Sequence, residues 1–328
     1  MSSSIASQLH QESIIIDGLN ASWFPDPRVL QHLHEGGVTA VNATIAAWHD
    51  PLETLDLFSA LLPLFEQHSD IIMQVESVED IAGAKESGRV GMILGFQDTA
   101  PIADNLGLLS VHYKLGVRII QLTYNHENLV GYGCQAPEDG GLTGFGREVV
   151  AEMNRLGILV DVSHCGPRTT LEAIETSTTP IAITHANPLA LLDMPRNKSD
   201  EVIRALAERG GVIGAVQFPA MVTRQFPATV ETYVDVIDHL VRVAGIDHVG
   251  LGPDFMEYMP AEVAAAALKG LPPEAIKQFA AIPPMQDFET AAKFPNVTAE
   301  LLRRGYAPED VKKIMGGNWL QLYEEVWT

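Results

Sequence analysis

Residues Ile158–His164, with the sequence ILVDVSH, and Pro180–His185, with the sequence PIAITH, are two short apolar runs that each end in a histidine. Nearly continuous apolar runs are typical of parallel strands that are covered on both faces, whereas an open antiparallel sheet shows alternation. Six similar runs occur along the chain, at Ile14–Asp17, Thr39–Ile45, Val90–Gln97, Val117–Tyr124, Gly211–Phe218 and Val249–Phe255. The pattern therefore predicts eight buried parallel strands.

Amphipathic segments separate these runs and predict helices, because their apolar residues recur at helical spacing with charges on the other face. The predicted helices are Leu52–Gln67, Val78–Glu86, Gly146–Arg155, Ser199–Glu208 and Thr229–Ala244. Eight strands with intervening helices favour a closed (β/α)8 barrel, the TIM barrel of the α/β class. An open nucleotide-binding sheet is disfavoured, since no G-x-G-x-x-G follows Ile16. We expect residues 1–328 to form a single domain.

Two long segments interrupt the barrel pattern. Asn125–Leu142 follows the predicted fourth strand, and Glu257–Lys293 follows the eighth and contains two expected helices, Ala261–Lys269 and Pro273–Ala280. Insertions after barrel strands lie at the carboxyl-terminal mouth, where active sites form, so we expect a rim or lid there. A final helix, Pro308–Trp327, carries aromatic residues that should pack on the barrel, and we expect a homodimer.

Composition limits the partners of this chain. Its 328 residues are 46% hydrophobic, and 21 basic against 42 acidic residues give a net charge of -21, which disfavours nucleic acid and anionic lipid surfaces. We find no signal-like start and no run of roughly 20 apolar residues, so we expect a cytoplasmic protein that does not enter a membrane. Cys134 and Cys165 are too few for a disulfide framework and should be reduced structural thiols.

Polar residues close several of the predicted strands, and catalytic groups of a barrel lie at these strand ends. His164 and His185 end two adjacent strands, and Asp254 follows the last one. Neutral imidazoles suit zinc, and a carboxylate can orient or deprotonate a metal-bound water. The three residues predict a divalent-metal site with hydrolytic chemistry.

Several motifs in the middle of the chain resemble the renal or membrane dipeptidase family, the M19-type members of the amidohydrolase superfamily. The resemblance extends over nearly the whole length. It rests on the run GLTGFGREVV, the strand DVSH and later short motifs, which are Gly141–Val150, Met153–Gly157, Asp161–His164, Thr184–Asn187, Pro195–Asn197, Gly252–Phe255 and Gly317–Trp319.

The resemblance implies roles for individual residues. His164 and His185 would bind the second metal of the family's pair, and Asp254 would be a ligand and proton-transfer group. Arg196 would hold a carboxylate of a small substrate, a task that suits its bidentate fork. Asn187, in the same motif as His185, is a candidate for substrate binding.

The same comparison reveals departures from the family's pattern. Where the family's first strand ends in H-x-D, this chain has Leu19 and Ala21. Gln97 stands in place of the carboxylate that bridges the two metals, and Tyr124 in place of a histidine after the fourth strand. A glutamine supplies no negative charge to hold two dications together, so we expect one divalent ion, zinc before other metals.

Other residues near the mouth are candidates to replace the missing groups. Gln97 or Asp254 could complete the shell of a single metal, and Tyr124 and His126 are candidate acid-base groups, with Tyr124 also facing substrate. His49 is interpreted as part of an ordinary loop, with Asp50 capping the helix that begins at Pro51. Leu19, Ala21 and Trp23 would make the pocket floor apolar, which suits an aromatic or aliphatic substrate.

Three functional hypotheses follow from the sequence. The first is a metal-dependent hydrolase that acts on an amide, lactam or ester of a small carboxylate-bearing substrate through one divalent ion and an Asp254-activated water. The second is a metal-free lyase or isomerase that uses His164, His185, Tyr124 and Asp254 as acid-base groups and keeps its activity in chelator. The third is a catalytically silent ligand-binding barrel, since a fold alone confers no activity.

Overall fold

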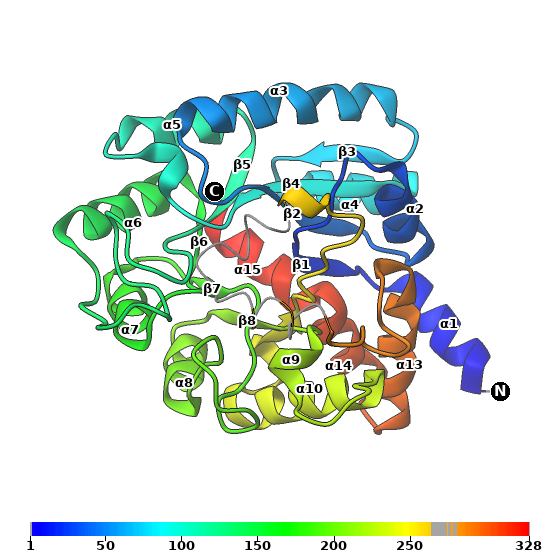
Figure 1. The fold of residues 1–328 in the computed structure, drawn as a ribbon. Coiled ribbons are helices and arrows are strands. Elements are labelled where there is room, and N and C mark those ends of the chain that lie inside the picture. Colours follow the sequence, from blue (N-terminus) through cyan, green and yellow to red (C-terminus); the bar gives the residue numbers. More distant parts are fainter. Residues whose placement is uncertain (1, 264–273, 275–276, 278–280, 328) are drawn as a thin grey trace.

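The strands of the computed structural model form a nearly closed parallel barrel, as predicted (Figure 1). The structure describes residues 2–263, 274, 277 and 281–327. Within those residues every strand pairing is parallel, and the path around the barrel is β1-β2-β4-β5-β6-β7-β8-β9. The strands are β1 Ile16–Asn20, β2 Ala40–Ala46, β3 Ile72–Val75, β4 Val90–Phe96, β5 Val117–Gln121, β6 Leu159–Asp161, β7 Ala182–Ile183, β8 Val212–Ala215 and β9 Val249–Leu251.

The barrel closes between its first and last strands. Asn20 forms a parallel bridge with Phe255, and the backbone N–H of Asp254 donates to the Leu19 carbonyl over 3.1 Å. Each of the eight predicted runs overlaps one barrel strand. The short strand β3 was not predicted: it pairs only with β4, outside the barrel path. Its four residues are only half covered, so they lack the continuous apolar signal of the other strands.

The five predicted helices are confirmed as α3 Pro51–Gln67, α4 Val78–Ser87, α6 Gly144–Leu156, α8 Asp200–Glu208 and α10 Val230–Ala244. Asp50 caps α3 as expected, accepting from the backbone of Glu53 while the Glu53 carboxylate accepts from the Asp50 backbone. The remaining α-helices that the structure describes are α1 Ser2–Glu12, α2 Pro27–Glu35, α5 Gly107–Lys114, α7 Pro167–Thr176, α9 Pro219–Val222, α13 Phe294–Arg303, α14 Pro308–Lys312 and α15 Asn318–Val326.

Short helical turns complete the chain: η1 Ala100–Ile102, η2 Ile246–His248, η3 Ala291–Lys293 and the π-helical turn η4 Lys313–Gly317. The expected C-terminal helix is thus split into α14, η4 and α15. The helices expected at Ala261–Lys269 and Pro273–Ala280 fall largely outside the described residues. No helix in the described part of the chain has the length and apolarity needed to span a membrane.

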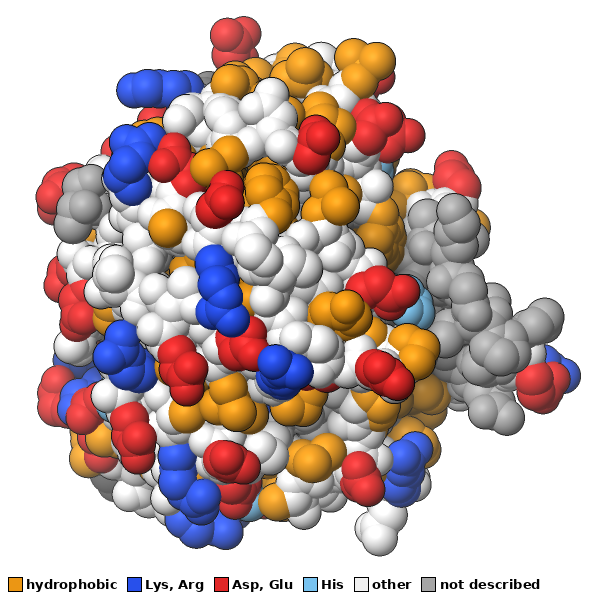
Figure 2. All heavy atoms as spheres, turned by 90° about the vertical axis from the view of Figure 1, so that its left-hand side faces the viewer, with side chains coloured by type: hydrophobic (Ala, Val, Ile, Leu, Met, Phe, Trp, Pro, Cys, Tyr) orange, Lys and Arg blue, Asp and Glu red, His pale blue; other side chains and the backbone are white. Residues whose placement is uncertain are grey.

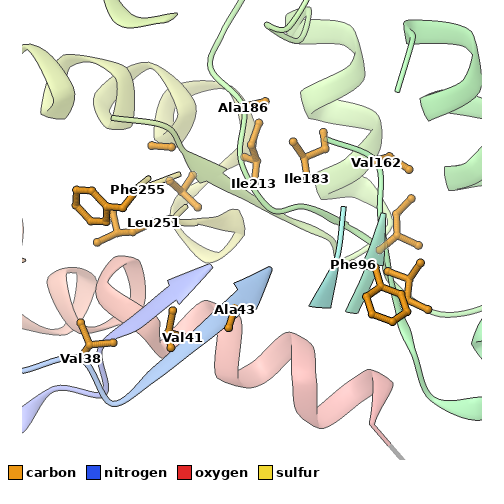
Figure 3. Close-up of a cluster of buried hydrophobic side chains, with 14 of the residues drawn as sticks. Val38, Val41, Ala43, Phe96, Val162, Ile183, Ala186, Ile213, Leu251 and Phe255 are labelled. Atoms are coloured by element: carbon orange, nitrogen blue, oxygen red, sulfur yellow. The ribbon is translucent and has the colours of Figure 1, made fainter. Parts of the chain in front are cut away.

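The outer faces of the strands pack against the surrounding helices. Val41, Ile213 and Leu251 are fully buried in this layer, together with Leu206 of α8 and Leu240 of α10 (Figure 3). Removing such apolar side chains from water is the main contribution to the stability of the fold. The strand order therefore places all carboxyl ends of the barrel strands on one rigid rim.

The barrel interior is filled from the amino-terminal side by α15, which lies near the centre of Figure 1. Trp319 and Tyr323 are fully buried among strand residues. The sequence predicted that they pack on the barrel, and the structure adds that they fill its interior. The indole N–H of Trp319 donates to the Leu251 carbonyl over 3.0 Å, and its ring lies where side chains of Gly18 and Gly250 would otherwise project. The polar site is thereby confined to the opposite end of the barrel.

Positive and negative side chains are interspersed on the face that carries α6 and α7 (Figure 2). Arg147 and Arg168 both pair with Glu172, and Arg155 pairs with Glu152. These pairs are exposed, so each contributes little to stability. On this face the basic side chains are paired locally with acids rather than gathered into a basic stripe.

Candidate functional site

Two buried histidines from neighbouring strand ends meet at the barrel mouth. His164 follows β6 and His185 follows β7, and they are 5% and 0% exposed. Their Nε2 atoms lie 2.9 Å apart, and the ring centroids are separated by 4.9 Å. The structure therefore brings together the two residues that the sequence singled out first.

Hydrogen bonds on the far side of His185 determine which of its nitrogens carries hydrogen. Asp161 accepts backbone N–H bonds from Ser163 and Thr184 and hydroxyl bonds from both residues, including Thr184 Oγ1 to Asp161 Oδ2 at 2.6 Å. Having donated its only proton, the Thr184 hydroxyl is an acceptor for His185 Nδ1–H, 2.8 Å away. The Nε2 atom of His185 is then left with a lone pair directed at His164.

The ring of His164 is held so that its Nε2 atom faces His185. Its Nδ1–H donates to the Oδ1 atom of Asn125 over 2.7 Å, and Asn125 adopts a left-handed φ of 61°. Tyr124 stacks on the other side of the imidazole, with 3.9 Å between ring centroids, and Trp48 meets Tyr124 edge to face. Both histidines therefore have their Nδ1 atoms committed and their Nε2 lone pairs facing each other.

Burial and nearby cations keep the histidine pair unprotonated. Desolvation lowers the pKa of both His164 and His185 well below the ordinary value, and the positive charges of Arg196 and Lys198 lower it further. Neutral imidazoles are the form that binds metal ions. The two nitrogens thus form a preorganised pair of donors at neutral pH.

Arg196 and Lys198 anchor the strand ends that carry the histidines. The guanidinium of Arg196 donates to the carbonyls of Ser163 and His185 at 2.7 and 3.0 Å. The ammonium of Lys198 donates to the carbonyls of Val162 and Cys165 at 2.9 and 2.7 Å. Burial lowers the pKa of Lys198 to about 8. Sequence reasoning identified Arg196 but missed Lys198, because nothing in its local sequence marks it as buried.

Asp254 lies at the same mouth after β9. It has a left-handed φ of 63°, a conformation that non-glycine residues retain only where surrounding structure holds it. Burial raises the pKa of Asp254 to about 6, the positive charge of Arg196 opposes this shift, and Asp161 adds to it. Its carboxyl group is therefore poised to exchange a proton near neutral pH.

The other predicted site residues differ in their surroundings. Gln97 is buried, and its amide N–H donates to Thr44 Oγ1 over 2.9 Å. His126 is exposed, and no described residue hydrogen-bonds to its ring. Asn187 is 1% exposed, and its amide is occupied by backbone groups of Val216 and Met221. This geometry gives Asn187 a role in holding the loop together and adds no support to the predicted contact with substrate.

The end of the first strand is apolar where the resemblance led us to look for ligands. Leu19 is 2% exposed, and Asn20 between Leu19 and Ala21 donates its amide N–H to Asp17 over 2.9 Å. Burial raises the pKa of Asp17 well above the ordinary value. Ser22 continues the turn by donating its backbone N–H to Asn20 Oδ1. This strand end is a hydrogen-bonded turn that contains the buried Leu19 side chain.

Both cysteines are free, in agreement with the prediction of reduced thiols. Cys165 is fully buried beside Lys198, and burial raises the pKa of its thiol to about 12. Cys134 is partly exposed, and its thiol lies 3.5 Å from Asn125 Oδ1. A thiol that stays protonated is a poor nucleophile, so Cys165 is structural.

The donor set for a metal ion consists, in this structure, of two imidazole nitrogens. Across residues 2–263, 274, 277 and 281–327, no group of three or more His, Cys, Asp and Glu side chains is arranged to hold a metal ion. Of the predicted shell of His164, His185, Gln97 and Asp254, the two histidines face each other through their Nε2 atoms, and the complete shell stays a prediction. The facing lone pairs nevertheless suit a cation that imidazole binds well, such as zinc.

A parallel barrel with this set of strand-end residues defines a (β/α)8 barrel of the amidohydrolase type. In agreement, an amidohydrolase from Pseudomonas aeruginosa has the same fold with a TM-score of 0.93 and 36% identity, over 98% of this chain and 99% of that one. A metallopeptidase from Rhodobacter sphaeroides, liganded with a phosphinate mimic of the dipeptide L-Ala-D-Ala, shares the fold with a TM-score of 0.81 and 21% identity, over 96% and 100% of the two chains.

The chain belongs to the membrane dipeptidase family, peptidase family M19, whose model matches residues 6–267 and 277–328. The dipeptidase tcpJ of Claviceps purpurea is 31% identical over 285 residues. That match covers 86% of this chain but 61% of the relative, so the chain spans about three fifths of the length of that curated relative.

Proposed function

We propose that this protein is a metal-dependent hydrolase that cleaves an amide, lactam or ester bond in a small substrate bearing a carboxylate, with dipeptides as the first class to test. Membership of the membrane dipeptidase family supports hydrolysis. The observation that carries the proposal is the facing Nε2 pair of His164 and His185, each ring fixed through its Nδ1 atom.

In this proposal His164 and His185 hold one divalent ion, and Gln97 or Asp254 completes its shell. A bound divalent ion would polarise the scissile carbonyl and lower the pKa of an attacking water. Imidazole donors favour zinc over magnesium or calcium, which prefer oxygen ligands. The metal site would be mononuclear in this proposal, since the resemblance described above implies that Leu19, Ala21 and Gln97 stand where the family has its remaining ligands.

Asp254 acts as the proton acceptor in this proposal. A carboxyl group with a pKa of about 6 is mainly ionised at neutral pH, so it takes a proton from water and returns it to the leaving group. Burial strengthens both interactions, since little solvent screens the carboxylate.

Arg196 and Tyr124 position the substrate. The N–H groups of Arg196 that are not bonded to backbone carbonyls are available for a substrate carboxylate, and its positive charge is felt at Asp254 and Tyr124. Burial raises the pKa of Tyr124, so its phenol remains protonated and can donate a hydrogen bond. Tyr124 is already oriented by its stacking on His164.

The direct test is the metal content per chain, measured by elemental mass spectrometry on the native protein and on the His164→Ala, His185→Ala double variant. The matched control is the His34→Ala, His68→Ala double variant, which removes two histidines from surface helices α2 and the end of α3. We expect about one divalent ion per native and control chain, none in the mouth variant, and dipeptide turnover that chelator abolishes. Absence of metal from zinc-supplemented native protein would refute the proposal.

One observation favours a second candidate, a metal-free acid-base enzyme in the same mouth. The Nε2 atoms of His164 and His185 are close enough to share a proton, and Asp254 has a pKa of about 6. Such an enzyme would keep its activity after chelation and lose it in Asp254→Asn. The chelator arm of the experiment above therefore separates the two candidates.

A further inference from the structure

A partly exposed tryptophan stands at the same barrel mouth as the histidine pair. Trp48 lies in the turn between β2 and α3, at the carboxyl-terminal end of the strand, and it is 41% exposed. Tryptophan is large and mostly apolar, so it is highly buried on average. Single exposed apolar side chains are nevertheless common on protein surfaces. The position and the contacts of Trp48 therefore decide whether it has a role.

Trp48 is connected to the histidine pair through one intervening ring. It meets Tyr124 edge to face, with 4.5 Å between ring centroids, and Tyr124 stacks on His164 with 3.9 Å between centroids. In the strand order β4 lies between β2 and β5, so Trp48 reaches across the end of β4 to a residue that follows β5. The rings of Trp48, Tyr124 and His164 thus form a continuous aromatic wall from solvent to the proposed metal site.

The turn that carries Trp48 is held on both sides by hydrogen bonds. After Trp48, Asp50 Oδ1 accepts from the backbone N–H groups of Leu52 and Glu53 at 2.8 and 2.9 Å, and the Asp50 N–H donates to the Glu53 carboxylate. Before it, the Ala46 carbonyl accepts from the N–H of Gln97 over 2.9 Å. These bonds restrict the turn, and a side chain held in place before binding loses less entropy when a ligand binds.

The exposed part of the Trp48 ring suits an uncharged apolar group. Removal of its apolar surface from water is favourable. An aromatic group can pack on indole edge to face or with an offset, as Tyr124 does, and an aliphatic group can cover its face. A carboxylate would lose hydration against this ring, whereas Arg196 can bind it. Arg196 donates to the carbonyl of Ser163, the residue before His164, so one small molecule can reach both Arg196 and Trp48.

We propose that Trp48 is a specificity-determining residue, which covers an uncharged aromatic or large aliphatic group of the substrate beside the bond to be cleaved. The inference rests on the proposed function for the identity of the ligand as a substrate. It adds the substrate class, which is a small carboxylate with an apolar group next to the amide, lactam or ester. Binding needs no turnover, so this role is tested separately from hydrolysis.

The experiment compares 3-phenylpropanoate with propanoate, two carboxylates that contain no hydrolysable bond, by calorimetry. The native protein should bind 3-phenylpropanoate at least tenfold more tightly. Trp48→Ala should weaken the binding of 3-phenylpropanoate about tenfold and leave that of propanoate unchanged, because the contact with Arg196 remains. Trp48→Phe should retain most of the preference. Leu62→Ala is the matched control, since Leu62 is 38% exposed on the adjoining helix α3, and it should bind both compounds as the native protein does.

Several results of this comparison would overturn the proposal. They are equal affinities of the native protein for the two compounds, no binding of 3-phenylpropanoate, and native binding of 3-phenylpropanoate by Trp48→Ala. An equal loss of affinity for both compounds in Trp48→Ala would also overturn it. That result would show that Trp48 maintains the shape of the mouth and does not contact the apolar group.

Fluorescence quenching by acrylamide provides a readout at Trp48 itself, because Trp48 is the most exposed of the four tryptophans. Saturating 3-phenylpropanoate should protect the native emission from acrylamide, and this protection should be absent in Trp48→Phe. Equal protection in both proteins would place the ligand elsewhere and contradict the proposal. A native dimer that dissociates in Trp48→Ala, with quenching unaffected by 3-phenylpropanoate, would show that a second copy of the chain covers Trp48 and would equally contradict it.

Dipeptide hydrolysis separates failure of this inference from failure of the proposed function. If no dipeptide is hydrolysed but the preference for 3-phenylpropanoate depends on Trp48, the hydrolase is refuted and the aromatic wall remains a binding site. If dipeptides are hydrolysed and Trp48→Ala lowers kcat/KM equally for Gly-Phe and Gly-Ala, the specificity role of Trp48 is refuted and the hydrolase stands.

Discussion

His164 and His185 face each other through Nε2 atoms that lie 2.9 Å apart, at the ends of adjacent parallel strands. Asn125 and Thr184 accept hydrogen bonds from the two Nδ1 atoms, so both Nε2 atoms carry lone pairs. Two facing lone pairs repel unless a cation lies between them. Because burial lowers the pKa of both rings, a metal ion competes well with a proton for this position.

The Asn125 side chain should determine how well His164 binds metal. Asn125→Gly removes the acceptor and tolerates the left-handed φ of 61°, whereas Asn125→Asp keeps an acceptor. We expect metal affinity to fall about 10–100-fold in the glycine variant, as for other partners of metal-binding histidines. Zinc titration against a competing chelator measures the effect. Equal zinc affinity in the glycine variant and the native protein would contradict the assignment of the hydrogen to His164 Nδ1.

Thr184 has the corresponding role for His185. Thr184→Val removes the hydroxyl that links His185 to Asp161, and we expect a cost of about 1–3 kcal/mol in the free energy of unfolding. Activity should fall about 10–100-fold. Thr184→Ser keeps the hydroxyl and is the control. Urea denaturation and steady-state kinetics provide the two readouts, and a fully active valine variant would exclude the proposed relay.

Arg196→Lys should raise the KM of a carboxylate-bearing substrate more than it lowers kcat. Arg196 donates to the Ser163 and His185 carbonyls from two different nitrogens and keeps further N–H groups for a bidentate contact. A lysine has all its N–H groups on one nitrogen, so it cannot reproduce this spread of donors. Loss of one charge-assisted hydrogen bond corresponds to about a 10–100-fold change in KM. Arg147→Lys on α6 is the control, and a KM that stays at the native value would argue against carboxylate binding by Arg196.

Asp98 should reduce stability as the pH rises. Burial raises its pKa from 3.8 to about 6 in the folded protein, so between these values the unfolded chain releases the proton first. The free energy of unfolding should therefore fall by about 3 kcal/mol in total, of which about 2 kcal/mol is lost between pH 4 and pH 6, and it should change little above pH 7. Asp98→Asn lacks this contribution. Urea unfolding of both proteins at pH 4, 5, 6 and 7 measures the two free energies of unfolding. The value for the variant minus the native value should increase as the pH rises to 6.

Gly250→Ala should destabilise the barrel because its new methyl group would lie 2.3 Å from the Trp319 indole nitrogen. Overpacking of this kind costs about 1–3 kcal/mol. Gly83→Ala in α4 is the matched control, since nothing lies within 4 Å of the added carbon, and it should stabilise by about 0.5–1 kcal/mol. Thermal unfolding of both variants tests the pair, and equal melting temperatures would show that Trp319 can shift.

The sequence predicted the barrel because strands buried on both faces need nearly continuous apolar residues, and that requirement is visible in each run. It also predicted that His164, His185 and Asp254 share one mouth, because strand ends of a parallel barrel point the same way. The cap at Asp50 was predictable for a similar reason, since capping depends on residues that are neighbours in the chain.

Only the tertiary structure revealed β3, the anchoring by Lys198 and the facing Nε2 atoms of His164 and His185. Each depends on contacts between segments that are far apart in the chain. Lys198, for example, reaches carbonyls that lie 33 and 36 positions away. Residue type and local spacing define which strand end a side chain occupies, whereas its direction and partners follow from how the strands and loops pack together.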